Sequence, residues 1–304
     1  MATLSVPGKI FLLGEYAILA GLPAIVAAVG PRFELRLSHH KKLSFHPQSP
    51  GGRLLTQAGL PSDLPFEFYD PFEGAGGFGA STAQFALSYR ALARERGWSE
   101  DWLDVWKCYR DLCRDPSGES IPPSGADLLA QWVGGIICCQ IEDSERADLR
   151  HFNGSSLWQN LMVFSASHQS GRKTATHHHL GSLHSKEFSH VAERLRMPLD
   201  AGLRAARAND AVSFGQAMTL YAEELRSAGL EIEPTLADRT ELSKISGVLG
   251  VKGTGASQSD AIIVLVDPSE PGCKDRVIQA ALARDLRLVS SGLTVEPGIS
   301  GETQ

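Results

Sequence analysis

Residues 74–82 combine glycine and hydroxyl residues in a spacing that suits phosphate binding. The residues concerned are Gly74, Gly76, Gly77, Gly79, Ala80, Ser81 and Thr82. The pattern from Ser81 to Arg96 predicts a helix that Gly97 ends. Unpaired N–H groups of a glycine-rich loop, together with the positive end of a helix dipole, bind phosphate. A glycine turn with a serine N-cap explains the same residues without a ligand, so this segment alone leaves both interpretations open.

Two other nucleotide motifs fit the segment poorly. Gly74, Gly76 and Gly79 have the spacing of the dinucleotide fingerprint, but that motif directly follows a hydrophobic strand. Here Asp70-Pro71 precedes the loop instead. A Walker P-loop would end in Gly-Lys-Ser/Thr, which this loop does not. A nicotinamide-dependent dehydrogenase is therefore a weak hypothesis.

Three segments together resemble the motifs of a kinase superfamily. Residues 7–17 read Pro-Gly-Lys-Ile-Phe-Leu-Leu-Gly-Glu-Tyr-Ala, residues 77–83 read Gly-Phe-Gly-Ala-Ser-Thr-Ala, and residues 251–261 read Val-Lys-Gly-Thr-Gly-Ala-Ser-Gln-Ser-Asp-Ala. In order and spacing they resemble the GHMP kinases, which include galactokinase, homoserine kinase, mevalonate kinase and phosphomevalonate kinase. The resemblance implies an α+β fold of two domains. A ribosomal S5 domain 2-like unit would span residues 1–155, and a ferredoxin-like unit would span residues 156–304.

Further features resemble the mevalonate branch of this superfamily. Pro123-Ser-Gly-Ala-Asp127 is similar to the catalytic segment of that branch. Tyr16, the Arg32-Phe33 pair and Asp260 favour a phosphomevalonate kinase, whereas the short chain favours a mevalonate kinase. The resemblance therefore implies transfer of phosphate from ATP to 5-phosphomevalonate, with mevalonate as the alternative acceptor. A non-catalytic relative that senses a nucleotide or metabolite is the hypothesis of another class.

The resemblance also implies a role for individual residues. Asp127 and Lys9 would be catalytic, and Ser81 would contact magnesium together with the ATP phosphates. The implied ATP-binding residues are Gly74, Gly76, Gly77, Gly79, Ala80, Ser81, Thr82, Gly253, Thr254 and Gly255. The implied acceptor-binding residues are Lys9, Glu15, Tyr16, Ser124, Gly125, Arg172, Lys173, Thr174 and Ala256.

The chain departs from the family pattern at three places. Ala80 replaces the usual first serine of the phosphate loop, and Ser257-Gln258-Ser259 replaces three glycines of the third motif. Pro116 stands where mevalonate kinases carry a magnesium-binding glutamate, so the second metal ligand stays open. Arg172-Lys173 and residues 39–42 are candidate cations for an acceptor phosphate, although a solvated charge run also explains both.

Hydrophobic periodicity predicts a mixture of strands and helices that would position these motifs. Strands are expected over residues 4–13, 24–29, 33–37, 136–141, 161–165, 261–266, 286–289 and 292–296, with a short one near Phe66. Helices are expected over residues 81–96, 100–114, 174–208, 211–228, 234–249 and 274–284, and from Ala126. Residues 46–76 are expected to be irregular around that short strand, and residues 142–150 read as a charged connection that could separate the domains.

Composition limits the partners. The 304 residues carry a net charge of −6, so no global positive field would hold nucleic acid or an anionic membrane. The apolar stretch from Ile10 to Val29 is interrupted by Glu15 and Pro23, so it is too short for a membrane span. The chain has five cysteines, an odd number, and no Cys-x-x-Cys pair, so we expect the cysteines to be reduced, which favours a cytoplasmic location. A monomer or homodimer that binds ATP and a small molecule is expected.

Overall fold

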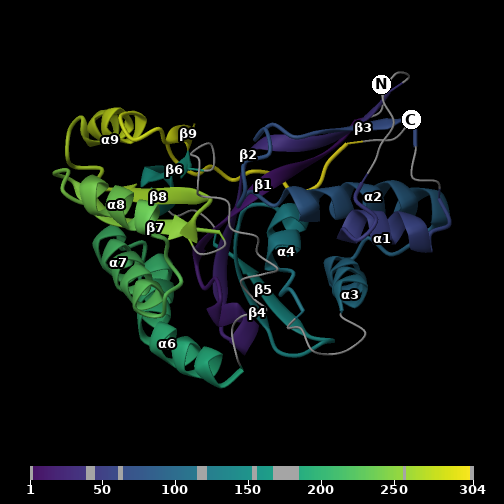
Figure 1. The fold of residues 1–304 in the computed structure, drawn as a ribbon, viewed down its shortest axis with the longest axis horizontal. Coiled ribbons are helices and arrows are strands. Elements are labelled where there is room, and N and C mark those ends of the chain that lie inside the picture. Colours follow the sequence, from purple (N-terminus) through teal and green to yellow (C-terminus); the bar gives the residue numbers. More distant parts are fainter. Residues whose placement is uncertain are drawn as a thin grey trace.

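The computed structural model describes residues 3–38, 45–60, 64–114, 122–152, 156–166, 185–255 and 258–301. These residues form two antiparallel sheets with helices packed on them, which confirms the expected α+β class. In Figure 1 the first sheet and its helices lie on the right, and the second sheet with its helices lies on the left. Within the described residues, no helix has the length and apolar character needed to cross a membrane.

The first sheet is built from the N-terminal half of the chain. Its strands run in the order β1-β2-β4-β5, and β3 pairs with β2. The bounds are β1 (Thr3–Leu13), β2 (Ala24–Leu37), β3 (Phe66–Tyr69), β4 (Ile136–Ile141) and β5 (Ala147–His151). The two strands expected over residues 24–37 are one continuous strand, because β2 stays paired with β1 on both sides of the Gly30-Pro31 step. The 3-10 helix η1 (Ala17–Ala20) connects β1 to β2.

Among the described residues, four helices accompany the first sheet (Figure 1). They are α1 (Pro50–Gln57), α2 (Ala80–Arg96), α3 (Trp102–Cys113) and α4 (Ala126–Val133). Both α2 and α4 pack on β1, while α1 packs on α2. The expectation that residues 46–76 are irregular was wrong for α1. Ser49 caps this helix by accepting a hydrogen bond from the Gly52 N–H, and Pro50 starts it with a suitable φ.

Residues 142–150 do not separate two units. β5 occupies residues 147–151 and pairs antiparallel with β4, so this segment belongs to the first sheet. A tight turn precedes it, in which Asp143 accepts hydrogen bonds from the N–H groups of Glu145 and Arg146. Its charged residues are compatible with a strand because β5 is at the edge of the sheet, where one side meets solvent.

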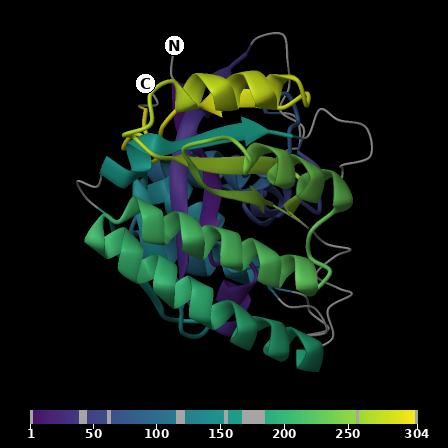
Figure 2. The same cartoon turned by 90° about the vertical axis from the view of Figure 1, so that its left-hand side faces the viewer.

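The second sheet has the strand order β7-β8-β6-β9. Its strands are β6 (Leu161–Ser165), β7 (Val248–Thr254), β8 (Ala261–Val266) and β9 (Arg287–Ser290), and the 3-10 helix η2 (Ser156–Asn160) precedes β6. The helices of this half are α6 (Ser185–Ala208), α7 (Ala211–Ser227), α8 (Glu233–Leu242) and α9 (Cys273–Leu282). Figure 2 shows α6 and α7 side by side below this sheet, with α9 above it.

The second half of the chain differs from the sequence expectations at residues 243–249 and 292–296. The helix expected over residues 234–249 ends at Leu242, because the chain turns and enters β7 at Val248. Residues 292–296 form no strand: Leu293 donates to the Trp158 carbonyl, and the chain then leaves the second sheet. The first part of the helix expected over residues 174–208 lies outside the described residues, and α6 begins at Ser185.

The C-terminal tail returns to the first sheet (Figure 1). Backbone hydrogen bonds join Ser300 to Ser5 in both directions. Arg32 holds the same tail, since its Nη2 donates to the Gly298 carbonyl at 2.7 Å and its Nη1 donates to the Pro297 carbonyl at 2.8 Å. Burial lowers the pKa of Arg32, and Glu296 opposes that shift. Arg32, one of the residues that favoured a phosphomevalonate kinase, therefore has a structural role here.

Candidate active site

Lys9 and Asp127 form an ion pair between the first sheet and α4. Lys9 and Phe11 are on the face of β1 that α4 covers, because side chains alternate along a strand. Asp127 is in the first turn of α4, where the helix dipole favours a negative charge. Lys9 Nζ is 2.9 Å from Asp127 Oδ2, and the side chains are 7% and 30% exposed. The carboxylate thus reaches solvent, while the ammonium group is nearly enclosed.

Gln131 connects strand β1 to the phosphate loop. It follows Asp127 by one helical turn and is fully buried. Its Nε2 donates to the Pro7 carbonyl at 3.0 Å and to the Gly79 carbonyl at 3.2 Å. Sequence analysis missed this residue. The signal was its spacing of four from Asp127, which puts both side chains on one face of α4.

The glycine-rich loop leads directly into α2. Gly79 is the N-cap with φ 85°, a left-handed conformation that favours glycine, and no side chain among the described residues caps this helix. The hydroxyl of Thr82 is buried and donates to the Gly79 carbonyl at 2.8 Å, whereas Ser81 is exposed. The first N–H groups of α2 are therefore not taken by a capping side chain, which leaves them suited to an anion.

Asp260, near the end of the third motif, lies against the phosphate loop. A Cβ atom added to Gly76 would be 2.3 Å from Asp260 Oδ1, and one added to Gly77 would be 2.6 Å from Asp260 Cβ. A Cβ atom added to Gly255 would be 2.1 Å from Asp260 Oδ2. Glycine at these three positions therefore lets the two loops close on one acidic side chain. Gly253 and Thr254 are buried at the end of β7, next to this contact.

Glu15 is buried in a polar junction between the first and third motifs. Lys252 Nζ forms an ion pair with Glu15 Oε1, and Gln258 Nε2 donates to the same oxygen at 2.9 Å. Both Lys252 and Gln258 are fully buried. Burial lowers the pKa of Lys252, although Glu15 opposes the shift. The Tyr221 hydroxyl donates to the Glu15 carbonyl at 2.7 Å, so α7 also fixes this position.

This junction accounts for one departure of the third motif from the family pattern. Gln258 has φ 58°, a conformation that glycine adopts readily, and its side chain fills the space beside Lys252 and Glu15. Thr235 donates to its carbonyl at 2.9 Å. Tyr16, the neighbour of Glu15, is nearly buried and has φ 66°.

Ser124 and Gly125 lie where α3 meets the start of α4. Gly125 is the N-cap of α4 with φ 75°, and it packs against Trp106. The indole N–H of Trp106 donates to the Ser124 carbonyl at 2.9 Å. Ser124 also lines a cavity of about 340 Å³ that extends towards η1 and the end of β4.

Other predicted positions are outside the described residues. They are Arg172, Lys173, Thr174 and Ala256, together with Pro116 and the basic residues 39–42. The described residues contain no cluster of three or more His, Cys, Asp or Glu side chains that could hold a metal. Magnesium bound with nucleotide phosphates needs only one or two protein ligands, so the exposed hydroxyl of Ser81 fits such an ion.

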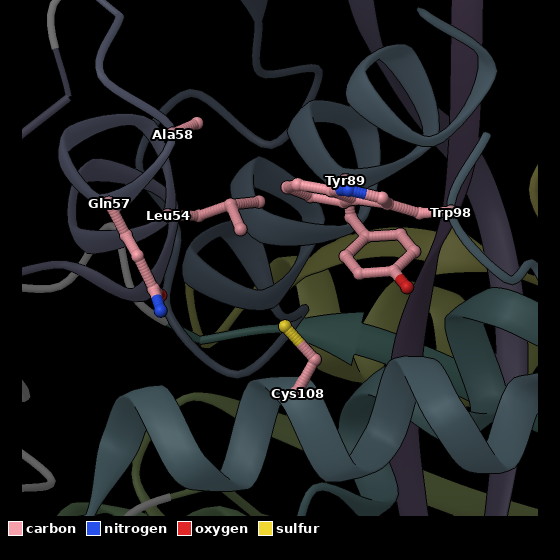
Figure 3. A pocket seen from close by; sticks show the side chains of 6 residues that line it. All are labelled: Leu54, Gln57, Ala58, Tyr89, Trp98 and Cys108. Carbon is pink, nitrogen blue, oxygen red and sulfur yellow. The ribbon is translucent and has the colours of Figure 1, made fainter. Parts of the chain in front are cut away.

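A second cavity lies apart from these motifs, between α1, α2 and α3 (Figure 3). It measures about 320 Å³ and is lined by Leu54, Gln57, Ala58, Tyr89, Trp98 and Cys108. Burial raises the pKa of the Cys108 thiol to about 11 and that of the Tyr89 hydroxyl to about 12. A thiol that stays protonated at neutral pH is a poor nucleophile, so this cavity lacks the features of a catalytic site.

Comparisons with known proteins place the fold. No protein-family model and no curated protein matches the chain. Among solved structures, phosphomevalonate kinase from Streptococcus pneumoniae is similar with a TM-score of 0.71 and 15% identity, covering 95% of this chain and 98% of that one. Mevalonate kinase from L. major, in complex with R-mevalonate, has a TM-score of 0.68 and 16% identity, covering 98% and 96%.

Galactokinase from Lactococcus lactis, complexed with galactose, matches as well. Its TM-score is 0.68 at 15% identity, with 98% of this chain and 94% of that chain covered. The chain therefore has the fold of the GHMP kinases over nearly its full length, as the three motifs indicated. Since kinases of mevalonate and of a sugar share this fold, the fold does not specify the acceptor.

Proposed function

We propose that this protein is an ATP-dependent kinase of a small molecule, acting on 5-phosphomevalonate to give diphosphomevalonate. The observation that carries the proposal is the Lys9–Asp127 pair at 2.9 Å, held next to the N-terminus of α2 by a hydrogen bond from the Lys9 N–H to the Phe78 carbonyl at 3.0 Å. Phosphoryl transfer depends mainly on positioning and on neutralising charge. A cation, a carboxylate and an uncapped helix N-terminus held together supply these requirements. Retention of both Lys9 and Asp127 disfavours a non-catalytic sensor.

The residues of the phosphate loop have separate roles in this proposal. The N–H groups at the start of α2 would hold the ATP phosphates, with Gly74, Gly76, Gly77 and Gly79 allowing close approach of the backbone. The hydroxyl of Ser81 would contact magnesium, which supplies charge neutralisation on the phosphates when it is bound. Lys9 would stabilise the charge that develops between donor and acceptor. Its near-complete burial supports this role, since charges interact more strongly away from water.

The role of Asp127 depends on the acceptor. An alcohol must lose its proton during attack, so Asp127 would accept the hydroxyl proton of mevalonate. A phosphomonoester, with a second pKa of about 6, is already largely ionised at neutral pH. With 5-phosphomevalonate, Asp127 would therefore act mainly by orienting Lys9.

The choice of acceptor rests on the resemblance to the mevalonate branch and on Tyr16 and Asp260. Mevalonate and phosphomevalonate kinases are among the proteins of similar fold, which is compatible with this branch but also with a sugar kinase. Mevalonate is the alternative acceptor, phosphorylated on its 5-hydroxyl. A cytoplasmic location, and a monomer or homodimer, remain predictions.

The test is a coupled ADP-release assay with mevalonate, 5-phosphomevalonate, homoserine and galactose offered in parallel. We expect release with 5-phosphomevalonate, and a loss of at least about 100-fold in kcat for Lys9→Met, because the variant lacks the transition-state cation. Lys244→Met is the matched control, since Lys244 forms an exposed pair with Glu241 at 2.7 Å. Release with none of the four acceptors would overturn the proposal.

A further inference from the structure

The cavity beside Ser124 joins an apolar side to a charged one. It measures about 340 Å³ and lies between η1, the end of α3 and the end of β4. Ile18, Leu19 and Ile141 contribute apolar surface, while Arg110, Ser124 and Ser144 contribute polar groups. Ser124 Oγ accepts a hydrogen bond from the Ala126 N–H at 3.3 Å, in the turn of α4 that carries Asp127, so the cavity adjoins the start of this helix. A small molecule with an apolar body and one charged end suits such a lining.

Arg110 is held in place by the residue that also positions Ser124. Its guanidinium lies over the Trp106 ring, 5.1 Å from the centroid. Trp106 is fully buried and donates its indole N–H to the Ser124 carbonyl at 2.9 Å. One aromatic side chain therefore orients both the cation and the segment that precedes the catalytic aspartate.

Within the part of the chain that the structure describes, no carboxylate forms an ion pair with Arg110, although the neighbouring Asp111 attracts it and so opposes the lowering of its pKa. Two acidic residues also line the cavity, but both interact with Arg146 instead. Arg146 lies 3.5 Å from Glu142 and 2.8 Å from Asp143. Half-burial lowers the pKa of Arg110, with Arg114 adding to that shift. A guanidinium that is partly desolvated without a counter-ion gains more from binding an anion than an exposed one does.

We propose that this cavity binds the carboxylate end of the acceptor, and that Arg110 is the residue that recognises it. This inference rests on the proposed kinase function. Mevalonate and 5-phosphomevalonate both carry a carboxylate at the opposite end from the oxygen that is phosphorylated. A planar guanidinium can bind a carboxylate through two parallel hydrogen bonds. With the carboxylate at Arg110, the chain of the acceptor runs past Ser124 towards Asp127 and Lys9.

The test compares three variants on α3 and at its end. Arg110→Met keeps an unbranched stem over Trp106 but loses the charge, and Arg110→Lys keeps the charge without the planar fork. Arg114→Met is the matched control, because Arg114 is exposed and pairs with Asp111 at 3.4 Å. Thermal melting checks that each variant folds. The readouts are the KM for each substrate and the acceptor Kd from titration calorimetry.

We expect Arg110→Met to raise the KM and Kd for both carboxylate acceptors by about ten- to a hundredfold, the usual loss for a charged hydrogen-bond partner. The KM for ATP should change less than about twofold, and Arg110→Lys should fall between the wild type and Arg110→Met. Arg114→Met should match the wild type. If the substitution disturbed only the packing of α3, it would not raise the KM for the acceptor while leaving the KM for ATP unchanged.

Several results would overturn the inference. Unchanged acceptor KM in an active, folded Arg110→Met variant would do so, as would a wild type that phosphorylates galactose alone. Weakened binding of 5-phosphomevalonate without weakened binding of mevalonate would assign Arg110 to the phosphate instead of the carboxylate. If the wild type releases no ADP, the kinase proposal fails and calorimetry still decides the inference. Absence of mevalonate and 5-phosphomevalonate binding to the wild type would then reject it.

Discussion

The unequal burial of Lys9 and Asp127 predicts that their substitutions differ in their effect on stability. Lys9 is 7% exposed and Asp127 is 30% exposed. Asp127→Asn would leave a cation enclosed without its counter-charge. Breaking a buried pair from one side costs about 3–5 kcal/mol, and the partial exposure of Asp127 reduces this to an expected loss of about 2 kcal/mol.

Lys9→Met should cost less. Methionine replaces the apolar stem, and the remaining carboxylate of Asp127 can be hydrated because it reaches solvent. We expect a loss below about 1 kcal/mol in the free energy of unfolding. The double variant removes the enclosed charge altogether, so it should be more stable than the sum of the single losses implies, by at least about 1 kcal/mol.

Urea unfolding followed by tryptophan fluorescence measures these differences directly. The four proteins are the wild type, the two single variants and the double variant. Lys244→Met serves as a control for loss of a lysine at an exposed pair. Equal losses in the two single variants, or a double variant that is simply additive, would refute the assignment of an enclosed cation stabilised by Asp127.

Three further predictions follow from the site and its surroundings. Asp127→Asn should lower kcat by about 10²- to 10⁴-fold with an alcohol acceptor, but less with a phosphate acceptor. If 5-phosphomevalonate is the confirmed acceptor and the variant still loses nearly all activity, the proposed role of Asp127 is contradicted. Gly77→Ala should raise the KM for ATP roughly tenfold, because the new Cβ atom would meet Asp260 at 2.6 Å. Gly59→Ala is its control, because Gly59 also has a positive φ of 69° but a Cβ atom added there would meet no atom within 4 Å. An equal change in the KM for ATP in both variants would argue against the contact between residue 77 and Asp260. Because the pKa of Cys108 is raised to about 11, its alkylation by iodoacetamide should be slow at pH 8, and the rate should rise about tenfold per pH unit up to a pH of about 11. Fast labelling of Cys108 at pH 8 would contradict its burial.

The sequence predicted the elements that have strong local signals. The apolar runs of β1, β4, β6 and β8 and the helix ended by Gly97 are confirmed. The short helix α1 was missed because it lies in a segment rich in proline and glycine and is stabilised by packing on α2. The edge strand β5 was missed because its charged residues resemble a solvated connection.

The candidate site likewise contains some residues that the sequence indicated and others that only the folded structure reveals. Motif resemblance pointed to Lys9 and Asp127, and the structure brings these two residues together. Gln131 belongs to no motif, since it acts through Pro7 and Gly79, which are distant in sequence. Arg110 belongs to none either, because the cavity that it lines also includes residues of η1 and β4. Gln258 looked like a loss of glycine in the third motif, and its contact with Glu15 emerges only when both halves of the chain are folded.

The identity of the phosphorylated product tests the central claim most directly. The protein is incubated with ATP, magnesium and 5-phosphomevalonate, and the mixture is followed by ³¹P NMR. Our account predicts that the monophosphate signal of the acceptor is replaced by the two coupled signals of a diphosphate as ADP accumulates, and that Lys9→Met prevents this change. An unchanged monophosphate signal with the wild type, or the same conversion by Lys9→Met, would contradict it.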